Sequence, residues 1–258
     1  MLYYQFALPV TLFALGAITA SFMGVVAARL HTGQSFLRGR SRCDACGKEL
    51  SPLQLVPIFS YIGSRGRAMC CGAGISILSP LVEILLGILF VISYLKLGLS
   101  VSLLITLVSL ALMLALVLYD FAHQILPPVL LIPFVLSSAI AAYVGASSFA
   151  DLMHTGFIAL ILAGILAALH FGSRGRAMGL ADTPFVLGLA FLVGPLAISG
   201  FVYSFWIGAV VGIWLLLGRP KGSRMGVEVP FAPFLAAGFL LAYFTQWNLL
   251  LLLAGSLS

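Results

Sequence analysis

The chain has 258 residues, of which 62% are hydrophobic and only 8% carry a charge. A soluble domain carries roughly 25% charged residues, so this composition excludes an ordinary water-soluble fold. The formal net charge is +6, but the basic residues flank apolar segments, and this pattern favours membrane topology over nucleic-acid binding. The apolar run 102–119 lacks the alternation of a transmembrane β-barrel strand, so helices are expected.

Eight apolar segments of about 17–25 residues follow one another, and a helix of that length crosses a membrane core of about 30 Å. A short turn near Gly194, Pro195 and Gly200 must separate the sixth segment from the seventh. The predicted fold is all-α, a polytopic transmembrane bundle of about eight spans with a small cytoplasmic cysteine-containing loop domain. The expected spans are 5–28, 77–97, 100–119, 125–146, 152–171, 184–200, 202–218 and 230–254.

The same segments suggest three parts of the chain, namely a first transmembrane helix (1–29), the loop domain (30–76) and seven further helices (77–258). If the N-terminus lies outside, twelve of the thirteen Lys and Arg residues fall on the inner side and only Lys96 falls outside. Basic loops are retained in the cytoplasm during insertion, so this orientation is predicted. The inner segments are 29–76, 120–124, 172–183 and 219–229.

Three acidic residues, Glu83, Asp120 and Asp182, lie inside or at the end of apolar segments. A carboxylate near the membrane costs several kcal/mol unless it faces protein or water, which makes these residues functional candidates. The structural alternative is that carboxylates at helix ends simply reach the interface. Asp120 and Asp182 are both predicted at the cytoplasmic side and therefore at one depth. Such a pair shares a proton and suits acid–base hydrolysis of a peptide.

Irregular backbone is expected beside both aspartates, where an extended peptide substrate would need room. Gly179 permits close approach of another backbone, and Pro127 and Pro128 interrupt a helix, although both features also mark ordinary helix ends. Gly179 and His123 are therefore candidate positioning residues. His123 follows Asp120 by one helical turn, where it either bonds the carboxylate or lies at the interface, and the interface is favoured.

All four cysteines, Cys43, Cys46, Cys70 and Cys71, lie in one polar segment. Its predicted cytoplasmic location argues against disulfides. The pair Cys43 and Cys46 has the spacing of a zinc half-site. A loop of about 45 residues is too small for a hydrophobic core of its own, which favours a structural metal. The alternatives are a loop held by packing or a redox-sensitive cysteine pair.

Four stretches, 16–50, 65–87, 119–128 and 176–185, resemble the type IV prepilin peptidases, which are membrane aspartyl proteases with a GxGD-type motif. The first two resemble the family's cysteine loop and its flanking helices. The stretch YDFAHQILPP resembles the family's first aspartate motif, and RAMGLADTPF resembles the second. The order of these motifs, together with eight spans, is typical of that family.

The resemblance implies an integral protein of the bacterial inner membrane that removes the leader from pilin-like precursors at the cytoplasmic face. Asp120 and Asp182 fall on the family's catalytic aspartates, and Cys43, Cys46 and Cys71 fall on three of its four zinc ligands. Many members also methylate the new N-terminus with S-adenosylmethionine, an activity associated with the cysteine loop. The implied partners are pilin-like precursors and membrane lipid, with no nucleic acid.

The chain departs from the family pattern at several positions. Ala68 replaces a cysteine and Ala181 replaces the glycine before the second aspartate, while Ala122, Pro128 and Pro184 replace polar residues near the two motifs.

Two other functions compete with that of a peptidase. One is a non-catalytic relative that binds pilin-like helices. The other is a proton-coupled transporter, which requires polar groups near the midplane of several spans, and besides Glu83 the sequence has few.

Overall fold

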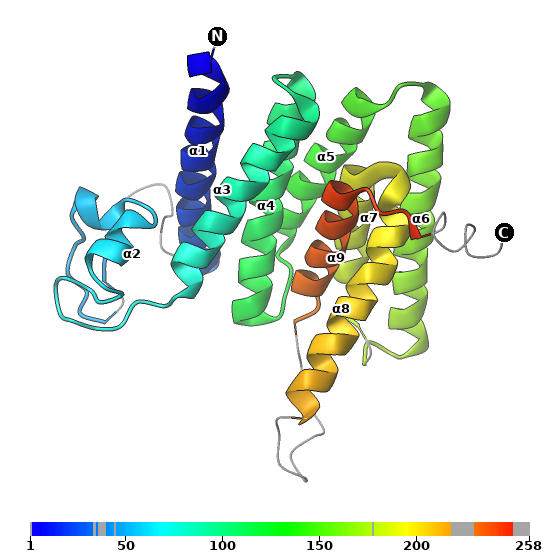
Figure 1. The fold of residues 1–258 in the computed structure, drawn as a ribbon. Coiled ribbons are helices and arrows are strands. Elements are labelled where there is room, and N and C mark those ends of the chain that lie inside the picture. Colours follow the sequence, from blue (N-terminus) through cyan, green and yellow to red (C-terminus); the bar gives the residue numbers. More distant parts are fainter. Residues whose placement is uncertain are drawn as a thin grey trace. The chain divides into compact units, whose positions relative to one another are not determined.

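The computed structural model describes residues 2–32, 35, 40–43, 45–176, 178–217 and 230–249. Within these ranges the regular elements are helices, and extended pairing is limited to two isolated bridges, which confirms the all-α class (Figure 1). The chain divides into two compact units, Met1–Leu103 and Leu104–Ser258, which are called the first and second units below.

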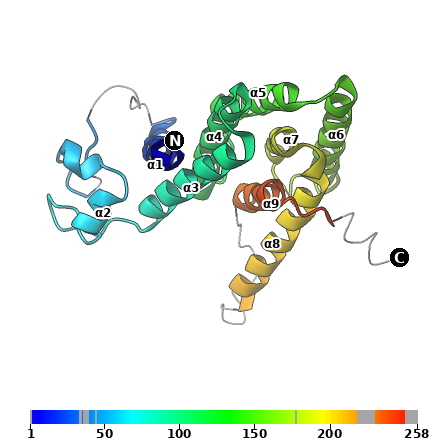
Figure 2. The same cartoon turned by 45° about the horizontal axis from the view of Figure 1, so that its top comes forward.

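The first unit pairs two long apolar helices, α1 (Leu2–Arg29) and α3 (Leu78–Leu97), which pack against each other (Figure 2). Between them lies the cysteine-containing loop, with the 3₁₀ helix η1 (Pro52–Leu55) and the short helix α2 (Phe59–Gly63). The helix α3 ends at Gly98, whose φ of 62° is left-handed and favours glycine.

Two glycines allow α1 and α3 to approach closely. A Cβ atom on Gly16 would lie 2.7 Å from the Cα of Gly87, and one on Gly87 would lie 2.8 Å from the Phe13 ring. Small residues at such contacts let membrane helices gain van der Waals packing that lipid alone does not provide. This contact fixes α3, and with it the end of the cysteine loop, against α1.

We expect Gly16→Ala to destabilise the first unit by about 1–3 kcal/mol, because the added methyl meets backbone atoms that cannot rotate away. Gly24→Ala is the matched control in the same helix, since a Cβ there meets no atom within 4 Å. Thermal unfolding in detergent should show a lower midpoint for Gly16→Ala alone. Equal midpoints for the two variants would contradict the close contact.

The second unit contains α5 (Pro128–Gly145), α6 (Phe149–Gly172), α7 (Asp182–Val193), η2 (Gly194–Leu196), α8 (Ala197–Leu217) and α9 (Ala232–Thr245), together with most of α4 (Val101–His123). The helix α7 lies among α5, α6 and α9 and is the most enclosed of these elements (Figure 2). Its side chains Phe185, Val186, Leu189 and Ala190 are fully buried. Its first residue, Asp182, is therefore held by the core of the unit.

The helices follow the predicted spans, but α7 and α9 are shorter than expected, and α9 ends at Thr245 where a span of 230–254 was predicted. Among the described residues, six helical stretches are long and apolar enough to cross a membrane, one of them the run 182–215 that includes α7 and most of α8. The predicted break is present at η2, although Gly200 lies inside α8. The helix α7 has 12 residues, about 18 Å, which is shorter than the expected span of 184–200. The count therefore lies between six and eight.

Some sequence predictions fall outside the described residues. These are the end of the last expected span beyond 249 and four of the basic residues used for orientation, Arg38, Arg219, Lys221 and Arg224. The three-part division of the chain and its orientation in the membrane stay predictions.

Candidate functional site

Asp120 lies in the last turn of α4 and is buried, with 6% of its surface exposed. Its Oδ2 accepts a hydrogen bond from the backbone N–H of Ala232 at 3.2 Å. Ala232 is the first residue of α9, where backbone N–H groups have no partner within the helix and the helix dipole favours negative charge. A helix that begins 112 residues later in the chain therefore orients this carboxylate.

Asp182 is the first residue of α7 and is 9% exposed. Its Oδ2 accepts a hydrogen bond from the N–H of Gly179 at 3.1 Å. A Cβ on Gly179 would lie 3.4 Å from the same oxygen, so a larger residue would crowd the carboxylate. The predicted positioning residue Gly179 thus lies directly against Asp182.

The two aspartates belong to the same unit, and packed helices hold both of them. Asp120 accepts its bond from the first residue of α9, and α9 packs against α7, the helix that begins at Asp182. Each is mostly shielded from solvent and fixed by one backbone donor, Ala232 for Asp120 and Gly179 for Asp182. Like charges at close range disfavour ionisation of both groups at once. The arrangement therefore suits a pair in which one carboxylate is ionised and the other holds a proton.

Two histidines border this region in different ways. His123 is exposed and stacks on Tyr119 with 4.4 Å between ring centroids, and within the described residues no hydrogen bond joins it to Asp120. The ring Nδ1 of His170 lies 2.8 Å from the carbonyl oxygen of Met178, the residue before Gly179. His170 is not among the site residues predicted from the sequence, and this contact places it beside the loop that precedes Asp182.

The four cysteines lie on two turns of the first unit that have the same geometry. One turn is closed by the bridge of Arg42 with Glu49, and the other by the bridge of Arg67 with Gly74. A glycine with a left-handed φ lies five residues after the arginine of each bridge. These glycines are Gly47, with a φ of 71°, and Gly72, with a φ of 73°. Each turn therefore reverses the chain at the same point.

The equivalence of the two turns explains the irregular second half-site. Cys71 occupies the position of Cys46, whereas Ala68 occupies the position of Cys43. Cys70 supplies the fourth thiol from the neighbouring position, and its Sγ lies 3.4 Å from the Sγ of Cys46.

The thiol cluster has the dimensions of a zinc site. The four Sγ atoms all lie within 4.8 Å of one another, with 3.7 Å between those of Cys43 and Cys71. A tetrahedral site with Zn–S bonds of about 2.3 Å places its sulfurs about 3.8 Å apart. The four cysteines therefore fit zinc, and they lie together in the first unit.

The local backbone also favours a thiolate at one of these positions. Backbone N–H groups of Cys46 and Ala45 lower the pKa of the Cys43 thiol to about 7. The hydrogen bond between the Cys46 and Cys70 thiols raises the pKa of Cys70 to about 12. Since the thiolate is the metal ligand, binding of zinc displaces protons from this cluster.

Comparison with known proteins assigns the chain to a family. The model of the bacterial peptidase A24 N-terminal domain matches residues 14–97. The prepilin leader peptidase/N-methyltransferase of Bacillus subtilis (strain 168) is 32% identical over 235 residues, which are 90% of this chain and 92% of that protein. The chain belongs to the prepilin leader peptidase family. The protein of the same name in Myxococcus xanthus (strain DK1622) is 34% identical, over 83% of this chain and 65% of that protein.

A third member of the prepilin leader peptidase family, from Pseudomonas putida, is 31% identical over 76% of this chain and 68% of its own length. No solved structure matches the chain. Family membership confirms the resemblance drawn from the four sequence motifs, and the six membrane-length helices make the chain an integral membrane protein.

Proposed function

We propose that this protein is an aspartyl endopeptidase that removes the basic leader from type IV pilin-like precursors at the cytoplasmic face of the bacterial inner membrane. The observation that carries the proposal is that the second unit buries two carboxylates, Asp120 and Asp182, each held by one backbone N–H. The names of the relatives, prepilin leader peptidase/N-methyltransferase, support the substrate class.

In the proposed reaction, the ionised carboxylate of the pair takes a proton from a water molecule, whose oxygen adds to the scissile carbonyl carbon. The protonated carboxylate donates its proton to the carbonyl oxygen. The C–N bond then breaks as the leaving amine takes the proton that the first carboxylate had received from water. The other carboxylate takes a proton back from one hydroxyl of the tetrahedral intermediate, which becomes the new carboxylic acid and leaves the pair in its starting state. The N–H groups of Ala232 and Gly179 hold one oxygen of each carboxylate, and in the proposed reaction the other oxygen takes or gives the proton.

The backbone beside both aspartates supports an extended substrate. The helix α4 ends three residues after Asp120, and Gln124 then takes a left-handed φ of 55°. The loop before Asp182 contains left-handed Arg174 and Gly175. A peptide must leave its helical form before its carbonyl is reached, and irregular backbone gives it room next to the carboxylates.

The test is a cleavage assay with purified protein in detergent and a pilin-like precursor that has a basic leader, a glycine before the cut and an apolar helix after it. The proposal expects a product whose mass corresponds to loss of the leader. Binding of the precursor without cleavage would instead favour a non-catalytic relative. Neither binding nor cleavage, with proton flux in vesicles, would favour the transporter.

We also propose that the chain methylates the new N-terminus, with zinc as a structural metal of the cysteine loop. Cys43, Cys46, Cys70 and Cys71 would hold the ion, since their sulfur spacing fits a tetrahedral site. When bound, S-adenosylmethionine supplies a methyl group on a sulfonium sulfur. Transfer to the amine forms an N–C bond, returns the C–S electron pair to sulfur and releases one proton from nitrogen to solvent.

A further inference from the structure

The cysteine loop carries a cluster of large apolar side chains on its surface, in the segment that forms η1 and α2. Leu53 is 81% exposed, Phe59 is 74% exposed and Ile62 is 66% exposed. Apolar patches that remain exposed on a folded chain usually mark a contact with a protein partner or with a membrane. This patch lies in the one segment that the sequence assigns to an extramembrane loop, so its contact needs an explanation.

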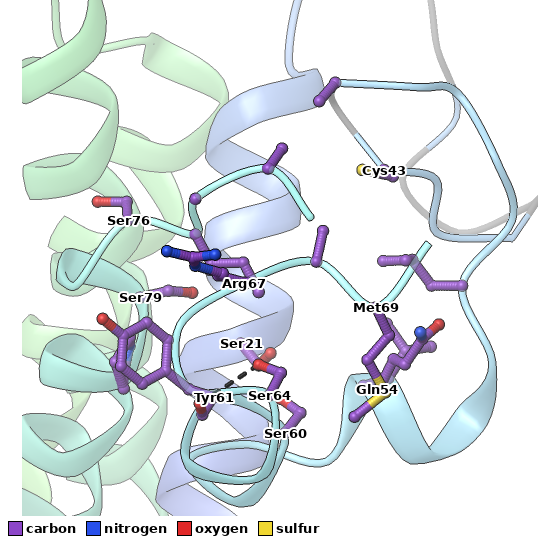
Figure 3. A pocket seen from close by; sticks show the side chains of 18 of the residues that line it. Ser21, Cys43, Gln54, Ser60, Tyr61, Ser64, Arg67, Met69, Ser76 and Ser79 are labelled. Atoms are coloured by element: carbon purple, nitrogen blue, oxygen red, sulfur yellow. Dashed lines mark hydrogen bonds between the residues drawn. The ribbon is translucent and has the colours of Figure 1, made fainter. Parts of the chain in front are cut away.

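The helix α2 and its C-cap are amphipathic in the opposite sense to a helix of a water-soluble domain. The side chains of Ser60, Tyr61 and Ser64 line a cavity of about 380 Å³ inside the first unit (Figure 3). Phe59 and Ile62 do not line this cavity and are exposed. In water the apolar face of a helix is buried and its polar face is exposed. The reverse arrangement suits surroundings that are apolar.

Contacts within the first unit place α2 beside the C-terminal part of α1 (Figure 1). The cavity that α2 lines is also lined by Ser21, which lies eight residues, or about 12 Å, before Arg29 at the end of α1. The N–H of Ile58, just before α2, donates a hydrogen bond of 2.7 Å to Oε2 of Glu83, in the second turn of α3. Both contacts hold α2 alongside the two membrane-length helices.

This position corresponds to a depth inside one leaflet. A charged residue at the end of a transmembrane helix, such as Arg29, lies among the lipid headgroups. Elements that lie in the membrane surface bury their apolar face about 5–10 Å into the boundary between headgroups and acyl chains. Since α2 contacts α1 at Ser21, its outer face meets lipid and not bulk water.

The membrane helices expose apolar side chains near the same depth. Ile18 and Phe22 of α1, on either side of Ser21, are 56% and 40% exposed, and Leu81 of α3 is 53% exposed. Exposed apolar side chains on helices that cross a membrane contact lipid. The first unit therefore presents apolar side chains outward from its helices and its loop alike.

Basic residues follow the apolar face directly. Arg65 and Arg67 come just after α2, and both are exposed. Within the part of the chain that the structure describes, the ion pairs of the loop are those of Glu49 with Arg40 and Arg42. Guanidinium groups bind phosphate oxygens well, and basic residues beside an apolar face are typical of elements that lie in a membrane surface.

We propose that η1 and α2 lie in the leaflet that contains the ends of α1 and α3. Leu53, Phe59 and Ile62 pack among the acyl chains, and Arg65 and Arg67 bind the headgroup phosphates. The cysteine loop is then an element of the membrane surface and not a domain that projects into solvent. The proposal involves no residue of the peptidase site, so it stands or falls independently of leader cleavage.

A second copy of the chain or the apolar helix of a precursor would also cover these side chains. Lipid is favoured because the contacts of α2 place the patch at the depth of a leaflet, where lipid is present before any partner arrives. The basic residues beside the patch complement phospholipid headgroups, whereas an apolar helix offers them no counter-charge.

The test is photo-crosslinking of the full-length chain in nanodiscs made of phosphatidylethanolamine and phosphatidylglycerol. The photoreactive residue p-benzoylphenylalanine is placed at position 59 or 62, and mass spectrometry measures what it bonds to. Both positions should gain a phospholipid, as should position 132, an exposed apolar site of the membrane-length helix α5. Position 48, an exposed polar site of the same loop, is the matched control and should give about tenfold less lipid adduct.

The other occupants predict different products. An adduct between two copies of the chain at positions 59 and 62, or no lipid adduct there, would overturn the proposal. Addition of a pilin-like precursor should leave the lipid adducts unchanged, and an adduct to the precursor in their place would also overturn it. Equal lipid adducts at positions 48 and 59 would contradict a defined depth for α2.

A second experiment needs no probe. The double variant Phe59→Ser, Ile62→Ser removes most of the apolar face, so a protease added to the nanodiscs should cut the cysteine loop about fivefold faster or more. Leu99→Ser is the matched control, since Leu99 is 72% exposed in the turn after α3 of the same unit. The thermal midpoint reports whether each variant is folded. Equal cutting of the loop in folded double variant and control would contradict the proposal.

Discussion

Asp120→Asn and Asp182→Asn should each lower the rate of leader cleavage by about 10³-fold or more, because each removes a group that must take or give a proton. The amide keeps the size of the carboxylate and an oxygen that accepts the hydrogen bond of Ala232 or Gly179. The loss should therefore appear in kcat while the thermal midpoint changes little. The measurement is the rate at which a labelled precursor loses its leader.

Asp151→Asn is the matched control for these variants. Asp151 is an exposed acid in the first turn of α6, and it lies in the same unit as the two buried aspartates. Its replacement should leave the cleavage rate within about twofold, as for most exposed positions. Full activity in either Asp120→Asn or Asp182→Asn would exclude a mechanism that uses two carboxylates.

The protein as purified should contain one zinc ion per chain, and the double variant Cys43→Ser, Cys46→Ser should contain none. Removal of two of four thiolates leaves too few ligands for a closed tetrahedral site. Because a loop of this size depends on its metal, protease should then cut the cysteine loop rapidly. Elemental analysis and limited proteolysis measure the two effects, and a wild-type chain without zinc would contradict the assignment.

The equivalence of the two turns gives a rescue experiment for the fourth ligand. Cys70→Ser should lower zinc affinity, and Ala68→Cys in the same chain should restore it, because Ala68 occupies in the second turn the position of Cys43 in the first. Zinc affinity should also fall as the pH drops below about 7, where the Cys43 thiol takes up its proton. An affinity unaffected by Cys70→Ser would remove that residue from the site.

Charge and hydropathy predicted much of the fold, because lipid leaves few alternatives to helices for an apolar chain. The break at η2 was predictable since Gly194 and Pro195 interrupt any helix, and Gly194 indeed takes a left-handed φ of 71°. The length of α7 was not predictable in this way. Its residues are apolar whether they face lipid or, as here, the interior of the unit.

The candidate site was only partly predictable, because depth in the membrane can be inferred from charges but lateral position depends on packing. The hydrogen bond from Ala232 to Asp120 joins residues 112 positions apart, and a backbone donor leaves no mark in the sequence. The contact of His170 with Met178 was missed for the same reason.

The sequence does contain a pattern that predicts the thiol cluster, although the spacing of the cysteines alone does not show it. The segments 42–49 and 67–74 both begin with arginine and both have a Cys-Gly pair at the same offset. Comparison of these two segments with each other would have predicted two equivalent turns. It would also have shown that Ala68 stands where the first turn has Cys43, which leaves Cys70 as the fourth candidate ligand already predicted from the sequence.

The central claim is that Asp120 and Asp182 face one another within the second unit, and cross-linking tests it directly. In a chain whose four native cysteines are serine, Asp120→Cys and Asp182→Cys would be treated with a short bifunctional maleimide. The account predicts a single intramolecular cross-link detected by mass spectrometry. It predicts none for Asp120→Cys with Asp151→Cys, since the 18 residues of α5, about 27 Å, intervene between them. A cross-link in the second pair and none in the first would contradict the account.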